Sequence, residues 1–326
     1  MIPQLLAKYY LYAEKRKTYY KAHPWINNVV SIISILFWVF AFKSSILDAN
    51  NIPSGSMQPT LKIGDFLFVN KMRYNFRIPF TDVQVVRYDK PSRGDIVTFT
   101  PEPGSPLHGK TLVKRVVGMP GDTVEVIDDE VFINGTGYTT YLAKDISIDE
   151  LNLDAHGQEY MDLFWEEIAG KDQQRQPVKH LIIKKKLDCR VNRNSSGNIN
   201  QFDQLSCAYN TEMRSPRHSW VIPADKYMVM GDNRDNSDDS RGCNLIADAV
   251  QWTSCRNGEL NESSKEWGLI PLQYIEGKVY LAYFSVNWGS AGLDPEINPL
   301  MNLVKLIQGK YPDASVRWSR IFERIY

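Results

Sequence analysis

One stretch near the N-terminus constrains this chain more than any other. Residues 25–42, WINNVVSIISILFWVFAF, are apolar apart from two asparagines and two serines. In a helix this stretch would extend about 27 Å, which is enough to cross the hydrocarbon core of a bilayer. We therefore predict a transmembrane helix, followed by a body that folds on one side of a membrane.

The charges beside this stretch predict its orientation. Basic residues are frequent before it, whereas Lys43 and Asp48 follow it. Since Lys and Arg are enriched on the cytoplasmic side of membrane anchors, residues 1–24 are expected to form a cytoplasmic tail and residues 25–43 the anchor, with the remainder exported. A cleavable signal peptide is the alternative. Its candidate cut, after Ala41, lies inside the apolar run, and the run is longer than a usual signal.

The composition indicates a folded body. Of 326 residues, 43% are hydrophobic and 23% are charged, as in ordinary globular proteins. The formal net charge is zero, which argues against a nucleic-acid partner because phosphate binding needs a basic surplus. The four cysteines form no C-x-x-C pair, so a zinc site is not expected.

Short runs rich in β-branched residues, bounded by Gly, Pro, Asp or Asn, recur along the exported part. They lie at residues 65–72, 94–100, 111–119, 123–135, 179–191, 227–231 and 277–286. The ING triplet at 133–135 is typical of a hairpin tip. We therefore predict a mainly β fold, in which an N-terminal transmembrane helix precedes antiparallel sheets.

A turn soon after the anchor carries two serines. The segment NIPSGSMQPTLKIGD places Ser54 and Ser56 between prolines. A serine becomes a nucleophile only when a neighbouring base takes its proton. No histidine is accompanied by an acid pattern, His23 falls on the cytoplasmic side, and no G-x-S-x-G elbow is present. The sequence leaves a Ser-His-Asp triad open without supporting it.

Lysine is the other base known to serve a serine. With an ordinary pKa of about 10.4 it is too basic by roughly 4.6 kcal/mol at pH 7, and burial among apolar neighbours supplies a shift of that order. Lys114 is the best candidate because it lies in the apolar run TLVKRVVGM, where strand alternation places it on one face with Leu112 and Val116. Spacing alone would still favour an exposed surface lysine.

Three segments resemble, in order, the signature boxes of bacterial type I signal peptidase, or leader peptidase. They are PSGSMQPTLKIGD (53–65), KRVVGMPGD (114–122) and GDNRDNSDDSR (231–241), with supporting matches at RGDIV (93–97) and WGLIP (267–271). This family contains Ser/Lys serine endopeptidases that remove signal peptides from exported preproteins. The resemblance implies such a hydrolase, of the Gram-negative type, with no metal or organic cofactor.

The resemblance also implies roles for individual residues. Ser56 matches the nucleophile and Lys114 the general base, while the Ser56 backbone N–H and the Ser54 hydroxyl match an oxyanion hole. Ser237 matches the residue that orients the lysine amine. The remaining supporting positions of the third box are Asp232, Asp239 and Arg241.

The same match implies a binding site for small side chains at the −1 and −3 positions of a signal peptide. The residues expected to line it are Ile52, Pro53, Met57, Leu61, Leu112 and Val113. The extended peptide is expected to add as a strand at the edges formed by residues 51–54 and 112–114. Leu112 stands where the family often has an aromatic residue, which leaves the shape of the pocket open.

Comparison with the family divides the exported body. Residues 44–122 and 223–326 are expected to form the catalytic domain, and residues 123–222 resemble the β domain that Gram-negative members insert. The single predicted span departs from the two spans of well-known members. The implied location is the inner membrane, with a cytoplasmic N-terminus, a periplasmic catalytic domain, and a monomeric enzyme whose partners are signal peptides and the lipid bilayer.

The cysteines fall into two groups. Cys189 and Cys207 lie in the expected insertion and could pair in the oxidising periplasm. Residues 242–266 form an extra loop before WGLIP, for which we predict a second disulfide between Cys243 and Cys255. Other pairings stay open.

Other functions remain open beside signal peptide removal. A specialised pilin- or conjugation-factor processing peptidase of the same family is supported by the extra loop. An inactive, anchored periplasmic binding module would require a broken Ser, Lys or third box, and all three are intact. A self-cleaving Ser/Lys switch protein would need no anchor.

Overall fold

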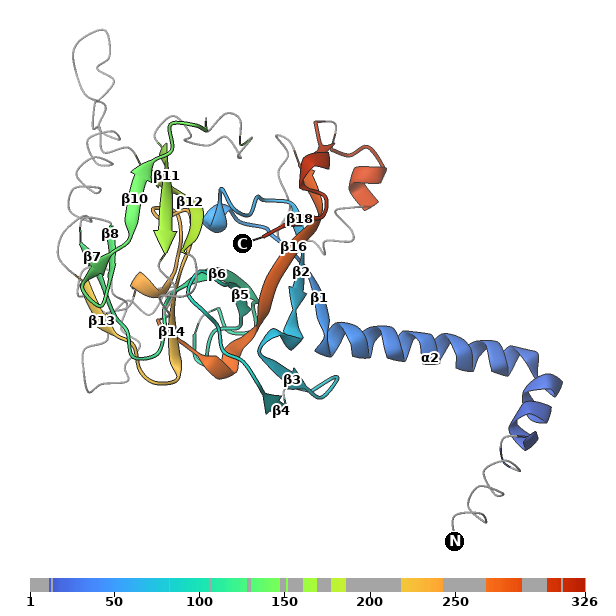
Figure 1. The fold of residues 1–326 in the computed structure, drawn as a ribbon. Helices are drawn as coiled ribbons and strands as arrows, with labels where there is room; N and C mark the ends of the chain where they lie inside the picture. The colour runs from blue at the N-terminus through green and yellow to red at the C-terminus, as the bar shows by residue number, and fades with distance from the viewer. Residues whose placement is uncertain are drawn as a thin grey trace.

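A long N-terminal helix projects from a β-rich body (Figure 1). The computed structural model describes residues 12, 14–81, 83–105, 107–127, 130–146, 151, 161–168, 177–185, 218–242, 268–288, 304–311 and 313–325. Helix α2 spans Pro24–Ser45 and begins at a proline, whose fixed φ suits the first turn. The helix is long and apolar enough to cross a membrane, which confirms the predicted apolar helix.

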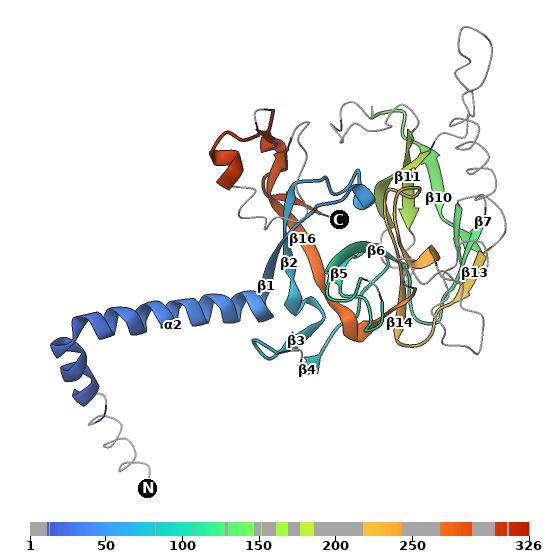
Figure 2. The same ribbon diagram turned by 180° about the vertical axis from the view of Figure 1, so that it is seen from behind.

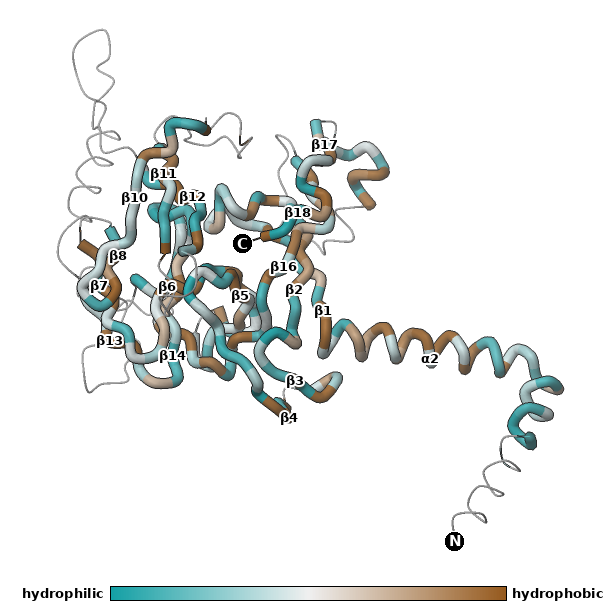
Figure 3. The backbone as a smooth tube through the Cα atoms, in the orientation of Figure 1, coloured by the Kyte–Doolittle hydropathy of each residue, from teal (hydrophilic) through white to brown (hydrophobic). Residues whose placement is uncertain are grey.

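Hydrophobic residues recur along most of the length of α2 (Figure 3). Large hydrophobic side chains from Trp25 to Phe42 are exposed, and the only buried residues of the helix are Ala41 and Ser45. A helix that is apolar all round and uncovered by protein is suited to contact with lipid.

The body is built around an antiparallel nine-stranded sheet with the order β1-β2-β16-β5-β6-β14-β15, in which β17 and β18 also pair with β16. The strands are β1 (Leu47–Asn51), β2 (Asp65–Asn70), β5 (Ile96–Phe99), β6 (Leu112–Gly118), β14 (Lys226–Met230), β15 (Ile270–Pro271), β16 (Ile275–Asn287), β17 (Ser315–Val316) and β18 (Glu323–Arg324). The mainly β prediction is confirmed.

Register shifts in β16 allow this sheet to curl. They occur where β16 pairs with β2 and again where it pairs with β5, and such bulges increase local twist. Ile52, Met57 and Leu61, which follow β1, pack in one cluster with the partly buried Val113 of β6. Three strands separate β1 from β6 in the sheet order, yet the curl brings the serine turn against β6.

Two smaller sheets lie on the side of the body away from α2 (Figures 1 and 2). One has the order β13-β7-β8-β9 and the other β10-β11-β12. Their strands are β7 (Thr123–Ile127), β8 (Glu130–Ile133), β9 (Thr136–Gly137), β10 (Thr139–Leu142), β11 (Met161–Ile168), β12 (Val178–Lys185) and β13 (His218–Val221). The predicted hairpin tip is confirmed, because Asn134 and Gly135 turn β8 into β9 with φ values of 52° and 79°.

A short hairpin beside the outer end of α2 was not predicted. It consists of β3 (Asn75–Arg77) and β4 (Gln84–Arg87), which pair only with each other. Short 3-10 turns complete the described elements: η1 (Gly55–Met57), η2 (Lys71–Arg73), η5 (Ser240–Gly242), η6 (Leu272–Tyr274) and η8 (Trp318–Arg320). Of these, η1 contains Ser56, and Ser54 lies immediately before it.

Candidate active site

The serine turn is a 3-10 helix preceded by one extended residue. Ser54 has φ −129° and ψ 156°, and η1 then spans Gly55–Met57. The Gln58 N–H donates to the Gly55 carbonyl at 3.1 Å, while the Met57 side chain is buried in the core. The turn is thereby anchored from below and leaves Ser54 exposed and Ser56 half-buried.

Lys114 of β6 meets the serine turn directly. Its Nζ donates to Ser56 Oγ over 2.8 Å, although the two residues are 58 positions apart. The lysine side chain is buried, so the alternative of an exposed surface lysine is wrong. Burial lowers the pKa of Lys114 to about 8, against the opposing effect of nearby carboxylates, of which Asp239 is the strongest. About a tenth of the amine is therefore neutral at pH 7 and able to take a proton.

The Ser56 amide is free to bind a developing negative charge. It lies in the first turn of η1, where amides have no partner within the helix, and no carbonyl in the described part of the chain accepts it. The hydroxyl of Ser54 stands on the exposed residue just before this turn.

Asn233 holds the serine turn from the third box, and sequence reasoning missed it. Its backbone N–H donates to the Ser56 carbonyl at 3.1 Å, and its side-chain amide donates to the Gly55 carbonyl, also at 3.1 Å. With both carbonyls held, the Ser56 N–H is turned away from the third box. The available signal was the position of Asn233 next to Asp232 in a box that already carried the resemblance.

Gly231 allows this close approach. A Cβ atom at this position would lie 2.5 Å from the Ser56 carbonyl oxygen and 2.1 Å from Ser237 Oγ, so only glycine fits. Ser237 thus lies close to the serine turn. Its buried Oγ has no hydrogen-bond partner in the described part of the chain, and the structure shows no bond from it to Lys114.

Asp239 and Arg241 form an ion pair beside this turn. Arg241 Nε lies 2.8 Å from Asp239 Oδ1, and Asp239 Oδ2 accepts the Gly231 N–H at 3.0 Å. Burial alone would raise the pKa of Asp239, but the Arg241 guanidinium and these hydrogen bonds lower it below its ordinary value. The pair fixes the backbone of Gly231 against Ser56.

A second, fully buried pair connects the second and third boxes. Arg115 donates to both carboxylate oxygens of Asp232, at 2.8 and 2.7 Å. Thr60, four residues after Ser56, donates its hydroxyl to the same carboxylate at 2.5 Å. Asp232 therefore ties the strand of Lys114, the third box and the serine segment together, while Arg115 points away from Lys114 as strand alternation predicts.

Strand β12 braces the third box from behind. The Ile183 N–H donates to the Asp232 carbonyl, and the Arg234 N–H donates to the Ile183 carbonyl, both at 2.9 Å. Glu166 of β11 pairs with Arg234 at 2.6 Å and lies 3.2 Å from His180 Nε2. The expected insertion therefore contributes charged groups and backbone bonds to the support of the catalytic segment.

No histidine whose side chain the structure describes is bonded to Ser56 in place of Lys114. His180 lies in the buried network behind the third box, where burial lowers its pKa. His108 Nδ1 lies 2.8 Å from the Pro101 carbonyl. His156 and the side chain of His218 lie outside the described residues.

The expected substrate-site residues divide by exposure. Pro53 is exposed and Leu112 and Val113 are half-buried, whereas three are almost fully buried in the core beneath them: Ile52, Met57 and Leu61. Strand β14 pairs with β6 only from Arg115 onwards, so among the described strands residues 112–114 have one uncovered edge. Strand β1 likewise pairs only with β2.

Some expectations fall on residues that the structure does not describe. Cys189, Cys207, Cys243 and Cys255 all lie outside the described ranges, as do residues 243–266 of the extra loop. Within the described ranges, no group of three His, Cys, Asp or Glu side chains could hold a metal ion.

Comparison with known proteins adds an independent observation. The sequence model of a family described as "Signal peptidase, peptidase S26" matches residues 25–284. Signal peptidase I of Pseudomonas aeruginosa is 30% identical over 85% of this chain and 76% of its own length. The Buchnera aphidicola enzyme of the same name is 32% identical over 73% of this chain and 79% of its own length. That of Aquifex aeolicus is 29% identical over 90% of this chain and 96% of its own length.

Proposed function

This chain belongs to the signal peptidase family, peptidase S26, and on that basis we propose that it is a membrane-bound serine endopeptidase that removes N-terminal signal peptides from exported preproteins. The observation that carries the mechanism is the 2.8 Å contact between Lys114 Nζ and Ser56 Oγ. Serine needs such a base, and burial lowers the pKa of Lys114 to about 8, so that part of the amine is neutral near pH 7 and can take the proton.

The proposed reaction begins at Ser56. Neutral Lys114 takes the hydroxyl proton while Oγ attacks the scissile carbonyl carbon. The Ser56 N–H and the Ser54 hydroxyl stabilise the oxyanion, and each such donor is worth about 2.7–4 kcal/mol in related sites. Protonated Lys114 then gives its proton to the leaving amine, which releases the mature protein and leaves the signal peptide esterified to Ser56.

Water completes the cycle. Lys114 takes a proton from water as the water attacks the ester carbonyl, and it returns a proton to Ser56 Oγ as the signal peptide leaves. Ser237, Asp232, Asp239 and Arg241 act through other groups: they position the lysine and the turn without touching the reacting atoms.

The substrate is proposed to bind as an added strand. The uncovered edge at residues 112–114 and the exposed segment at Pro53 and Ser54 offer backbone groups beside the nucleophile. The side chains at −1 and −3 would rest on Leu112 and Val113, above the buried layer formed by Ile52, Met57 and Leu61. Because this buried layer leaves little depth beneath the backbone of the bound peptide, the site favours small side chains.

We also propose the arrangement in the cell. Residues 1–24 would lie in the cytoplasm and α2 would cross the inner membrane once, so that the catalytic domain (44–122 and 223–326) and its inserted β domain (123–222) lie in the periplasm. The enzyme would act as a monomer, without a nucleic-acid partner.

The test uses purified protein in detergent and a preprotein with an Ala-x-Ala site. Wild type, Ser56→Ala and Lys114→Ala are compared by gel shift and by the mass of the new N-terminus. Cleavage after Ala-x-Ala by wild type alone is the expected result. No cleavage by wild type would overturn the general peptidase function in favour of a dedicated substrate or a binding role, and full activity of Lys114→Ala would overturn the proposed base.

A further inference from the structure

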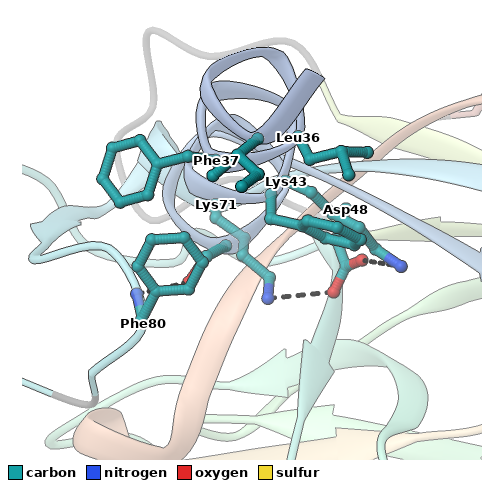
Figure 4. A pocket seen from close by; sticks show the side chains of 9 residues that line it. Leu36, Phe37, Lys43, Asp48, Lys71 and Phe80 are labelled. Atoms are coloured by element: carbon teal, nitrogen blue, oxygen red, sulfur yellow. Dashed lines mark hydrogen bonds and ion pairs between the residues drawn. The ribbon is translucent and has the colours of Figure 1, made fainter. Parts of the chain in front are cut away.

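The hairpin β3–β4 turns its tip towards the transmembrane helix. The Phe80 N–H donates to the Ser44 hydroxyl at 2.9 Å, and the ring centroids of Phe80 and Phe37 lie 5.6 Å apart (Figure 4). Phe80 has a φ of 63°, which is unusual for a residue with a side chain. The tip is therefore held in a strained conformation that places an aromatic ring against α2.

With α2 spanning a membrane, this contact would lie at the depth of lipid chains. Phe37 precedes the last residue of the apolar run, Phe42, by five positions, which is roughly 7.5 Å along a helix. Three amides of the described tip residues are bonded, which suits that depth: Ile78 N–H to the Val83 carbonyl, Thr81 N–H to the Ile78 carbonyl, and Phe80 N–H to Ser44. Without water, each unbonded amide would cost several kcal/mol.

The hairpin also exposes an unusual amount of apolar surface. Six large hydrophobic side chains, each 44–57% exposed, project from it: Ile78, Phe80, Val83, Val85, Val86 and Tyr88. A two-stranded hairpin bearing so many apolar groups would be unfavourable in water. Its surface is continuous with the apolar surface of α2.

A groove of about 560 Å³ lies beside this contact and is lined by residues of α2 and by Phe80 of the tip, a volume in the range of small-molecule sites. Its walls are apolar and its outer end is polar (Figure 4). The apolar lining consists of Ile33, Leu36, Phe37, Phe40 and Phe80, and the polar end of Lys43, Ser44, Asp48 and Lys71.

The polar end has an excess of positive charge. Lys71 Nζ lies 2.9 Å from Asp48 Oδ2, and Lys43 Nζ lies 3.9 Å from Asp48 Oδ1. Figure 4 shows the two amines on either side of the carboxylate. Two ammonium groups share one carboxylate, which leaves one positive charge to attract an anion at the level where headgroups begin.

We propose that this groove binds an anionic phospholipid of the leaflet on the catalytic side. One acyl chain lies between Phe37, Phe40 and Phe80, and the phosphate lies against Lys43 and Lys71. The groove has an apolar part followed by a cationic end, and a phospholipid has the matching order because its phosphate directly follows its acyl chains. This match favours a phospholipid as the occupant. The hydrophobic segment of a signal peptide has no anion to match the lysines.

The test is native mass spectrometry of the full-length protein, released from nanodiscs that contain equal amounts of phosphatidylglycerol and phosphatidylcholine with the same chains. Wild type is expected to retain phosphatidylglycerol in preference. In the double variant Lys43→Gln/Lys71→Gln, the ratio of retained phosphatidylglycerol to phosphatidylcholine is expected to fall by roughly tenfold. The control Lys110→Gln/Lys144→Gln makes the same change of charge at exposed lysines outside the groove and is expected to behave as wild type.

The variant Phe80→Ala tests the contribution of the acyl chain separately from that of the headgroup. It is expected to reduce retention of both lipids by a similar factor, because it removes one apolar wall and leaves the charges. Cleavage of a soluble peptide substrate in detergent, unchanged in every variant, reports that the fold is intact. Equal retention of the two lipids by wild type, or equal losses in the double variant and its control, would overturn the site.

A photo-crosslinker at Phe40 tests the competing occupant. Crosslinking to phospholipid is expected, both with and without a preprotein in the nanodisc. Crosslinking to the signal peptide of the preprotein in place of lipid would overturn the proposal and assign the groove to the substrate.

Discussion

The surroundings of Lys114 and those of Lys62 differ in what each amine meets. Both side chains are buried, at 5% and 9% exposure, and burial lowers the pKa of each to about 8. Lys114 contacts the Ser56 hydroxyl, which has a proton to give, whereas Lys62 donates to the Leu151 backbone carbonyl, which has none. A lowered pKa makes an amine available as a base, and the neighbouring group decides whether there is a proton for the amine to take.

The charges around the two amines also differ. After burial, the strongest effect on Lys114 comes from the Asp239 carboxylate, which raises its pKa, whereas the strongest on Lys62 comes from the Arg320 guanidinium, which lowers it. Lys114 thus reaches a pKa of about 8 in acidic surroundings through burial. Lys62 reaches the same value with help from a cation.

The largest expected effect is on catalysis, and it separates the two lysines. Lys114→Met should lower kcat/KM by about 10²–10⁴-fold, the usual contribution of a general base. Lys62→Met should change it by less than about threefold, because no reacting group is near. Rates are measured on one signal peptide substrate, with thermal unfolding as the control for folding. Equal losses of kcat/KM in both variants would show that the loss comes from impaired folding and not from removal of the base.

Breaking the buried ion pair behind each lysine should destabilise the fold. Asp232→Asn removes the carboxylate that pairs with the buried Arg115, whereas Asp65→Asn still leaves Arg320 paired with Glu323 at 2.9 Å. Asp232→Asn is expected to cost about 3–5 kcal/mol of unfolding free energy, and Asp65→Asn less because Arg320 keeps that partner. Urea denaturation measures this, with the exposed Asp238→Asn as a control expected within about 0.5 kcal/mol. A small effect at Asp232 alone would mean that Thr60 and the backbone suffice to hold the site.

The pH dependence of activity should follow Lys114. With a pKa of about 8, the neutral fraction of the amine rises from roughly 1% at pH 6 to half at pH 8, so kcat/KM should rise about 50-fold over this range and level off above it. Lys62→Met should keep the same profile. A profile that is flat between pH 6 and 8 would contradict the assignment of Lys114 as the base, and a profile altered by Lys62→Met would contradict the comparison.

The smallest expected effect is a gain in stability. The pKa of Lys114 is lowered on folding, to about 8. Below about pH 8 the amine is protonated in both the folded and the unfolded state, and burying its charge destabilises the folded state. The free energy of unfolding then rises with pH until the amine of the unfolded chain also loses its proton near pH 10.5. Lys114→Met should therefore stabilise the protein at pH 7, on the order of 1–3 kcal/mol. The gain should shrink between pH 8 and 10.5. Unfolding midpoints at pH 7 and 10.5 check this, and a gain that does not depend on pH would point to packing instead.

Much of the architecture could be predicted from local pattern. The apolar run predicted a helix over 25–43 and the helix spans Pro24–Ser45, because length and composition alone decide whether a segment can cross a bilayer. The strands at 65–72 and 111–119 were found for a similar reason, since β-branched runs bounded by turn residues depend little on distant contacts. The hairpin β3–β4 was missed because its apolar residues are exposed and not packed in a protein core, so they follow no alternation set by such a core.

The residues that hold the site were less predictable. Asn233 acts through a backbone N–H and a side-chain amide on two carbonyls, and neither bond leaves a pattern in the sequence. The backbone bonds of Asp232 and Arg234 to Ile183 join the third box to a strand of the expected insertion, about fifty positions earlier in the chain. Such contacts depend on how the sheets pack, which no local spacing encodes.

The sequence by itself determined the apolar anchor, the two hydroxyl groups on a stiff turn, and the presence of a lysine in an apolar strand. It did not determine which lysine lies where it could act as a base, because Lys62 and Lys114 are both lysines near apolar residues and both have a pKa of about 8. That difference was decided by the tertiary structure. The curl of the sheet carries Ser56 across three strands to Lys114, and a proton can be transferred only between groups that folding brings into contact.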